Sequence, residues 1–286
     1  MIKLKLFTFL SISKIVLMAQ LPNSDLWLFS IKSSKENFEL KNPLNINNRE
    51  GYDNQPSFSE DGKKLFYVSI KEDKQSDIYF YDIKKKQNLR FTNTTESEYS
   101  PTQSPNSELI STVIVEKDSA QRIHLLNGKS AHDDDKFEMD SVGYFSYLNT
   151  DTLVYYKLTE PHTLKIFIKS NQTDFLICHR PIRGFKAINR HCLLYGIKDS
   201  LLTTYFKYDF LLGRAYRYAQ SSAQSEDLVW HPIFGLLISD KATILKYIPE
   251  TSTWQVLFDL SPFGIKKITR FTFDKKNNYL VVVNNL

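Results

Sequence analysis

The sequence predicts an all-β fold, and three observations support this prediction. The 286 residues include 20 Phe and 16 Tyr, and an aromatic share of 14% favours strands. A short extended segment, a polar turn and an apolar run recur in that order along the chain. The recurrence has a nearly constant period of about 43 residues, which is typical of the blades of a β-propeller.

The repeat is clearest at residues 55–68, where Gln-Pro-Ser-Phe precedes the turn Ser-Glu-Asp-Gly and an apolar strand follows. The residues immediately before each such turn are Phe58, Gln103, Tyr147, Ile188, Trp230 and Phe273. Successive members of this series are 45, 44, 41, 42 and 43 residues apart. Helical solenoids of similar repeat length require a 3.6-residue apolar periodicity that is missing here. The six repeats therefore predict a six-bladed β-propeller.

Each repeat continues with a third strand and usually a fourth. In the first complete repeat these strands are expected at residues 77–81 and 88–91. Later third strands are expected at residues 122–126, 163–167, 203–208 and 242–247. The repeat at residues 101–141 is expected to end in an irregular or shortened edge, because its last segment is polar and acidic.

The two ends of the chain carry complementary partial repeats. Residues 25–29 and 37–40 resemble a third and a fourth strand without a first pair, and the last repeat contains only two strands. Pairing the N-terminal half-blade (about 25–40) with the C-terminal half-blade (about 268–286) would satisfy strand edges that are otherwise open. We therefore expect the ring to be closed by the two chain ends.

Residues 1–19 have the layout of a secretory signal peptide. Lys3 and Lys5 precede an apolar stretch, and Ala19 provides a small residue at the expected cleavage position. Lys14 interrupts the stretch, so an N-terminal strand or a poorly ordered tail remains the alternative. No other segment approaches the ~18 continuous apolar residues that a membrane helix needs. The sequence thus predicts a signal peptide at 1–19, a single propeller domain at 20–286, and export to the periplasm or the outer membrane.

The net charge argues against nucleic acid as a partner. The chain carries a formal charge of +5, and removal of residues 1–19 with their three lysines leaves +2. Nucleic-acid binding usually requires a larger imbalance concentrated on one face.

Residues 56–66 followed by Asp77-Ile78-Tyr79 resemble the TolB-type WD-like propeller repeat, which reads Pro-x-Trp-Ser-Pro-Asp-Gly-Lys-x-Ile and then a strand containing Ile-Tyr. A second copy starts at Phe91, and the resemblance extends over residues 50–126. It implies six blades and a role in the bacterial envelope. The end of the leader, Met18-Ala19-Gln20, is similar to leaders of Bacteroidota envelope proteins. TolB-like repeats in that group often accompany peptidoglycan-binding and outer-membrane assembly modules, so the implied partner is an envelope protein or peptide.

Two groups of side chains in the sequence contain residue types that can bind metal ions. Cys178-His179 and His191-Cys192 are unsuited to chelating one ion, because adjacent residues on a strand point to opposite faces. Packing is the expected role of the two cysteines, and a disulfide between them stays open. The run from His132 to Asp135 lacks the alternating ligands and the glycine of a calcium loop. No metal site and no cofactor are predicted.

The loops that enter each first strand, and those that join the second and third strands, cluster at one mouth of a propeller channel. The candidate binding residues there are Tyr52, Asp53, Asn54, Glu98, Tyr99, Arg183, Glu226, Asp227 and Lys267. Their mixture of aromatic, acidic and basic groups suits docking of a peptide or protein, although each of them could simply cap its own strand.

No catalytic residue is assigned, because the sequence lacks nucleophile, metalloprotease and phosphate-loop motifs. We expect an exported, non-enzymatic propeller that serves as a binding or scaffold module of the cell envelope. The alternative is a periplasmic propeller enzyme such as a polysaccharide lyase or glycoside hydrolase. The oligomeric state is left open.

Overall fold

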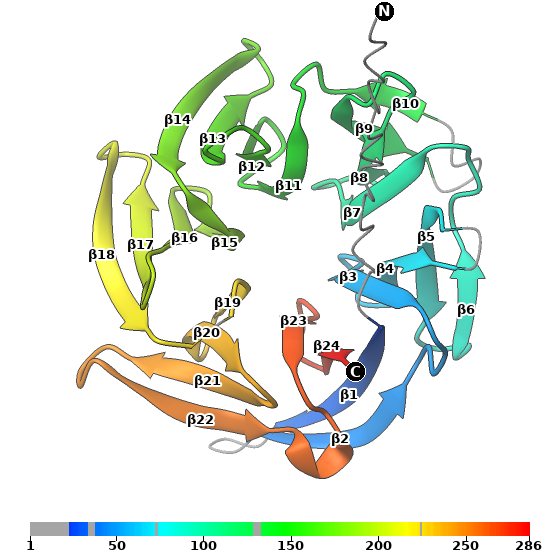
Figure 1. Ribbon diagram of the computed structural model, residues 1–286, viewed down its shortest axis with the longest axis vertical. Helices are drawn as coiled ribbons and strands as arrows, with labels where there is room; N and C mark the ends of the chain where they lie inside the picture. The colour runs from blue at the N-terminus through cyan, green and yellow to red at the C-terminus, as the bar shows by residue number, and fades with distance from the viewer. Residues whose placement is uncertain (1–22, 34–37, 72–73, 128–132, 224) are drawn as a thin grey trace, which may run out of the picture.

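The computed structural model describes residues 23–33, 38–71, 74–127, 133–223 and 225–286. Within these residues the fold is all β, with 24 strands and one short 3-10 helix, η1 (Ser261–Phe263). The sheets are arranged around a common centre, which is the arrangement expected of a β-propeller (Figure 1). None of the described residues forms a helix long and apolar enough to cross a membrane. The expected signal peptide, residues 1–19, lies outside the described residues.

Four of the sheets contain four consecutive antiparallel strands each. The first two of these sheets consist of β7 (Ser97–Gln103), β8 (Ile110–Val115), β9 (Gln121–Leu126) and β10 (Asp133–Lys136), and of β11 (Val142–Tyr147), β12 (Thr152–Lys157), β13 (Thr163–Ile168) and β14 (Thr173–His179). The other two consist of β15 (Pro181–Asn189), β16 (Cys192–Lys198), β17 (Thr203–Asp209) and β18 (Arg214–Ser221), and of β19 (Leu228–His231), β20 (Gly235–Asp240), β21 (Thr243–Ile248) and β22 (Thr253–Asp259).

The remaining eight strands form one sheet made of two quartets. The first quartet is β23 (Ile268–Phe273), β24 (Tyr279–Asn285), β1 (Ser24–Ser33) and β2 (Phe38–Asn45), and the second is β3 (Tyr52–Phe58), β4 (Lys64–Ile70), β5 (Ser76–Asp82) and β6 (Gln87–Arg90). A single parallel bridge between Ser24 and Tyr52 connects the two quartets. Strand β1 pairs antiparallel with β24 from Ser24–Asn285 to Ser30–Tyr279. The first and last strands of the chain therefore share a sheet, as the complementary partial repeats predict.

Burial decreases from the second strand of each quartet to the fourth. In β24 the run Leu280 to Val283 is completely buried, and its β-branched residues suit a strand that is covered on both faces. The outer strand β22 instead leaves 60% of Val256 exposed, and every residue of β6 is exposed. This gradient explains why the second strands stand out in the sequence as apolar runs.

The apolar core lies between neighbouring sheets. The described residues contain six clusters of buried apolar side chains, and each lies between two adjacent quartets of strands. One cluster packs Leu26 and Val281 against Leu65 and Tyr79. The two quartets of the eight-stranded sheet are therefore separate packing layers.

The turn between the first and second strands explains how the repeat motif changes along the chain. Gly62 adopts a left-handed backbone (φ +74°), and its N–H donates to the carbonyl of Ser59 at 2.9 Å. Asn277 has a left-handed backbone at the equivalent position, and its N–H donates to Asp274 at 3.0 Å. Because Asn tolerates this conformation better than most residues, the turn persists after the glycine is lost.

The structure also tests two further points of the sequence analysis, the irregular edge of the repeat at residues 101–141 and the disulfide between Cys178 and Cys192. The edge strand β10 is short and its pairing with β9 shifts register between Asp133 and Asp135, which confirms the expected irregular edge. Cys178 and Cys192 are both free thiols, so the disulfide left open by the sequence is absent from the described fold. Cys178 packs beside the core between two sheets, where burial raises the pKa of its thiol to about 12.

Candidate functional site at the channel mouth

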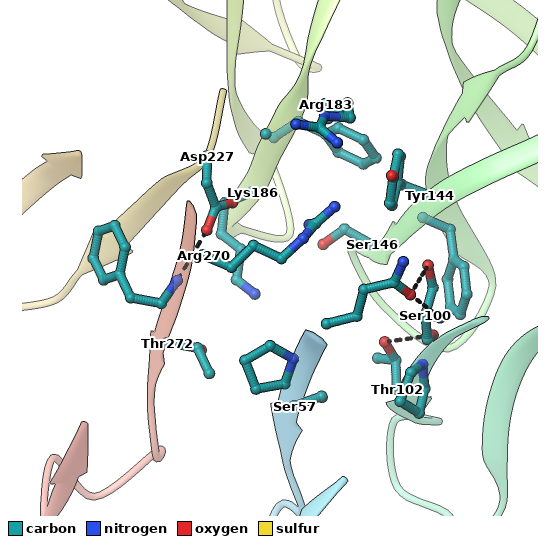
Figure 2. Close-up of a pocket in the computed structure, with 17 residues that line it drawn as sticks. Ser57, Ser100, Thr102, Tyr144, Ser146, Arg183, Lys186, Asp227, Arg270 and Thr272 are labelled. Atoms are coloured by element: carbon teal, nitrogen blue, oxygen red, sulfur yellow. Dashed lines mark hydrogen bonds between the residues drawn. The ribbon is translucent and has the colours of Figure 1, made fainter. Parts of the chain in front are cut away.

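The innermost strands surround a cavity of about 160 Å³ at the centre of the molecule. Strands β3, β7, β11, β15 and β23 contribute its walls together with Asp227, the residue before β19. Figure 2 shows polar side chains from these different strands converging on this space. The cavity is thus built by residues that are far apart in the sequence.

Bulges in the innermost strands shape one side of the cavity. The pairing of β3 with β4 shifts register between Asn54 and Ser57, and that of β7 with β8 shifts between Tyr99 and Thr102. The bulges contain Gln55 and Ser100, each with a φ of +55° and each followed by proline, which needs no partner for an N–H. The N–H of Ser100 donates to Oε1 of Gln55 at 2.6 Å, so the two neighbouring bulges are tied together.

The two sides of the cavity differ in charge. Strands β3 and β7 contribute neutral groups, among them the hydroxyls of Ser57 and Thr102. Charged residues occupy the opposite side and come from β15, β23 and the residue before β19 (Figure 2). A ligand in the cavity would therefore meet neutral hydroxyls on one side and charged groups on the other.

An ion pair joins two neighbouring sheets at the mouth. Nε of Arg183 donates to Oε2 of Glu226 at 2.7 Å, and the two side chains are 48% and 40% exposed. Gly184 allows this approach, because a Cβ there would lie 2.8 Å from the carbonyl oxygen of Glu226 and 2.8 Å from the N of Leu228. The backbones of two sheets are thus in direct contact beside the pair.

Asp227, Lys186 and Arg270 form a second charged group deeper in the cavity. Oδ2 of Asp227 accepts the N–H of Phe271 at 3.1 Å, which links the start of β19 to β23. Burial raises the pKa of Asp227, and the nearby Arg270 opposes this shift. Burial also lowers the pKa of Lys186, and Asp227 opposes that shift. Asp227 therefore lies near both Lys186 and Arg270, but within the described part of the chain it forms no ion pair with either of them.

Aromatic side chains complete the mouth. The guanidinium carbon of Arg270 lies 4.8 Å from the ring centroid of Tyr144, within cation–π range. Burial raises the pKa of Tyr52, and the positive charges of Arg270 and Arg183 oppose this shift. Burial, with the negative charge of Glu226 nearby, raises the pKa of Tyr156 to about 12. Three tyrosines and two arginines thus lie together.

The structure brings together four of the nine residues that the sequence proposed for the mouth. Arg183 and Asp227 line the cavity. Glu226 is paired with Arg183, and Tyr52 lies within electrostatic range of Arg270 and Arg183.

Two further candidates, Asp53 and Glu98, are fully buried and hold strand entrances together. Oδ1 of Asp53 accepts Nη2 of Arg49 at 2.7 Å, and the carbonyl of Asp53 accepts the hydroxyl of Ser24 from β1 at 3.0 Å. Glu98 accepts the hydroxyls of Thr92, at 3.1 Å, and Thr94. Burial raises the pKa of Glu98 to about 7.

The other three candidates also lie outside the cavity lining. Asn54 is buried and accepts the N–H of Gln55 at 2.8 Å, and Tyr99 packs between two sheets against apolar clusters. Lys267 is exposed, and its backbone N–H donates to Oδ1 of Asn284 at 3.2 Å.

Sequence reasoning missed Tyr144, Lys186 and Arg270, which complete the charged half of the cavity. Their signal is positional. Gln55, Ser100 and Tyr144 are separated by 45 and 44 residues, and Arg270 follows Tyr144 by 126 residues, which is three repeat lengths. The four residues therefore occupy the same place in their repeats. Aligning the repeats at this phase would have marked both residues as facing the channel.

The described residues contain no group of three or more His, Cys, Asp or Glu side chains placed to hold a metal ion. His179 and His191 belong to this part of the chain, whereas His132, in the acidic run considered for calcium, lies outside it.

No protein-family model and no curated protein matches the sequence. Among solved structures, a protein described as a TolB from Agrobacterium tumefaciens has a TM-score of 0.71 at 10% identity, covering 93% of this chain and 99% of that chain. TolB from Acinetobacter baumannii has a TM-score of 0.58 at 10% identity, covering 92% of this chain and 64% of that chain. An oligogalacturonate lyase in complex with manganese has a TM-score of 0.53 at 9% identity, covering 94% and 99%. The fold is thus similar to that of TolB-type proteins and of an enzyme, and identities this low concern the fold alone.

Proposed function

We propose that the chain is a six-bladed propeller, a single domain over residues 20–286, closed by pairing its two ends. The pairing of β1 with β24 supports closure at the N- and C-terminal strands. The six core clusters between neighbouring quartets support six blades, because a closed ring has as many interfaces as blades.

The function that the site supports best is binding of a peptide or a protein segment at the channel mouth, by an exported scaffold module of the cell envelope. The observation that carries this proposal is the grouping of Tyr52 and Tyr144 with Arg183, Glu226 and Arg270 around one cavity. Tyrosine and arginine are among the residues that contribute most to protein-binding energies, because each combines a large contact area with polar groups.

The test is a selection of peptides from an unbiased random library displayed on phage, using the purified full chain. Affinities of the selected peptides are then measured by fluorescence polarisation. We expect Tyr52→Ala and Arg183→Ala each to weaken binding about tenfold or more. Tyr216→Ala and Arg214→Ala are matched controls on the outer strand β18, and they should leave binding unchanged. A library that yields no peptide, or peptides insensitive to both mouth substitutions, would contradict the proposal.

A second candidate is cleavage of a carboxylated sugar chain, as in a polysaccharide lyase. The observation that favours it is Tyr144 lying beside Arg270 inside the cavity. In β-elimination, a cation neutralises the uronate carboxylate and a base removes the C5 proton. The C4–oxygen bond of the glycosidic linkage then breaks, which leaves a C4–C5 double bond, and the departing oxygen takes up a proton from an acid or from water. The assay is the ultraviolet absorbance of the unsaturated product from oligogalacturonate. Turnover that is lost in Tyr144→Phe would favour this second function.

A further inference from the structure

Two cations in the central cavity have no hydrogen-bond or ion-pair partner among the residues that the structure describes. Lys186 comes from β15 and Arg270 from β23, and both line the cavity. Neither side chain forms a hydrogen bond or an ion pair with another described residue. Figure 2 shows Arg270 reaching across the space toward Ser146 and Tyr144. The contact of its guanidinium with the Tyr144 ring orients the cation while leaving its N–H donors available.

The charge balance of the cavity favours a ligand with one negative charge. Arg183 and Glu226 neutralise each other in their ion pair. Lys186 and Arg270 then face a single carboxylate, Asp227, whose Oδ2 is held by the N–H of Phe271. One positive charge remains, and one carboxylate would balance it, whereas a phosphate dianion would leave an excess negative charge in a confined space.

The size of the cavity indicates a single chemical group. Its volume of about 160 Å³ is close to that of an engineered protein cavity of roughly 150 Å³ that accommodates one benzene molecule. This space suits one side chain or one chain terminus. The hydroxyls of Ser57, Ser146 and Thr272 line the same space and could donate to the oxygens of a carboxylate.

We propose that the central cavity binds one carboxylate group of a peptide, held by Lys186 and Arg270. This inference rests on the proposed peptide-binding function and adds the chemical group that enters the channel. The carboxylate belongs either to an acidic side chain or to the C-terminus of the peptide, and the two sources are separated by experiment.

The test uses isothermal titration calorimetry on the full chain with four N-acetylated hexapeptides of Gly and Ser. They carry Glu or Gln at the third position and a free or an amidated C-terminus. At least one carboxylate-bearing peptide is expected to bind ten times more tightly than the amidated Gln peptide, and the pattern identifies the source of the carboxylate. Lys186→Met and Arg270→Met should each weaken this binding tenfold or more.

Lys84→Met is the matched control, since Lys84 is an exposed cation between β5 and β6, outside the cavity lining, and it should bind like the wild type. Arg270→Lys keeps the charge and should restore part of the affinity, which separates loss of the cation from damage to the fold. Equal binding of all four peptides would overturn the inference, as would trigalacturonate or inorganic phosphate binding more tightly than every carboxylate peptide. Library-selected peptides that depend on Tyr52 but tolerate both methionine variants would overturn the carboxylate site alone and leave the proposed function standing.

Discussion

Buried carboxylates at the entrances of the innermost strands have a structural role. Asp53 and Glu98 occupy equivalent places in successive repeats, 45 residues apart, and both are completely buried. Arg49 donates to Asp53, whereas two threonine hydroxyls donate to Glu98. Burial raises the pKa of both carboxyl groups, because removing a charge from water costs free energy.

The pKa of about 7 for Glu98 predicts a pH-dependent stability. In the unfolded chain the pKa of Glu is about 4.3, so between these values the folded protein binds more protons than the unfolded one. The contribution of Glu98 is therefore favourable at low pH and is lost as pH rises through 7. We expect Glu98→Gln, which stays neutral, to gain roughly 2 kcal/mol in unfolding free energy relative to wild type between pH 5 and pH 8. Urea unfolding across this range measures the difference. The exposed Glu138→Gln should show no such trend, and a pH-independent difference for Glu98→Gln would refute the assignment.

Gly184 is the residue on which the geometry of the mouth depends most directly. A Cβ at this position would meet only backbone atoms of Glu226, Asp227 and Leu228, at 2.8 to 2.9 Å. Gly184→Ala should therefore push two sheets apart and cost about 2 kcal/mol or more, with weaker peptide binding at the mouth.

The matched control is Gly143→Ala, because a Cβ there first meets the side chain of Leu158 at 3.1 Å. That side chain is partly exposed and can move, so a loss of less than about 1 kcal/mol is expected. Guanidinium denaturation of both variants provides the comparison, and equal losses would show that the backbone contact at Gly184 is unimportant.

At the scale of the strand, position within the quartet decides how much a residue contributes to stability. Val282 in the second-strand position of its quartet is completely buried and pairs with Trp27 of β1, whereas Val256 in an outer strand is 60% exposed. Val282→Ala should cost about 2 kcal/mol, and Val256→Ala less than about 0.5 kcal/mol. Thermal or urea denaturation measures both. Similar losses at the two positions would contradict the burial gradient from inner to outer strands.

The strands themselves were largely predictable from the sequence. Second strands such as β4 and β24 are continuous apolar runs because both of their faces are covered, and the turn before each of them is set by Asp, Asn or Gly. The bulges in β3 and β7 were not predicted. A bulge inserts one extra residue into a strand and reverses which of the following side chains face the channel. In the sequence the two bulges are marked only by Gln55 and Ser100 standing before prolines, and the positive φ of these residues is seen only in the structure.

At the scale of the whole molecule, the proposed export of the chain yields a prediction about its N-terminus. When residues 1–286 are expressed in a Gram-negative host, the protein should be recovered from the periplasm, and its intact mass should correspond to a chain that begins at Gln20. Ala19→Arg should block cleavage, because the cleavage site requires a small residue there, and leave the full-length chain. Intact-mass spectrometry of the wild-type protein and of Ala19→Arg measures whether cleavage after residue 19 takes place. A wild-type protein that retains Met1 and remains in the cytosol would contradict export.

The candidate site could be predicted only in part, and the residues show why. Tyr52, Arg183, Glu226 and Asp227 were found because they lie at the entrances of first strands, which a propeller gathers at one mouth. The same rule also selected Asp53 and Glu98, whose side chains turn into the protein. Position along the strand was thus predictable, whereas the direction of each side chain was not.

The repeat, the strand order and the pairing of the two chain ends could be predicted from the sequence, because they follow from local apolar patterns and turn residues that recur with a nearly constant period. That Lys186 and Arg270, 84 residues apart, enter one cavity beside Tyr144 and Asp227 could be seen only in the folded chain. The physical reason is that the cavity is formed by innermost strands from different sheets. Their bulges and backbone contacts set the direction of each side chain, and no single segment of the sequence encodes that arrangement.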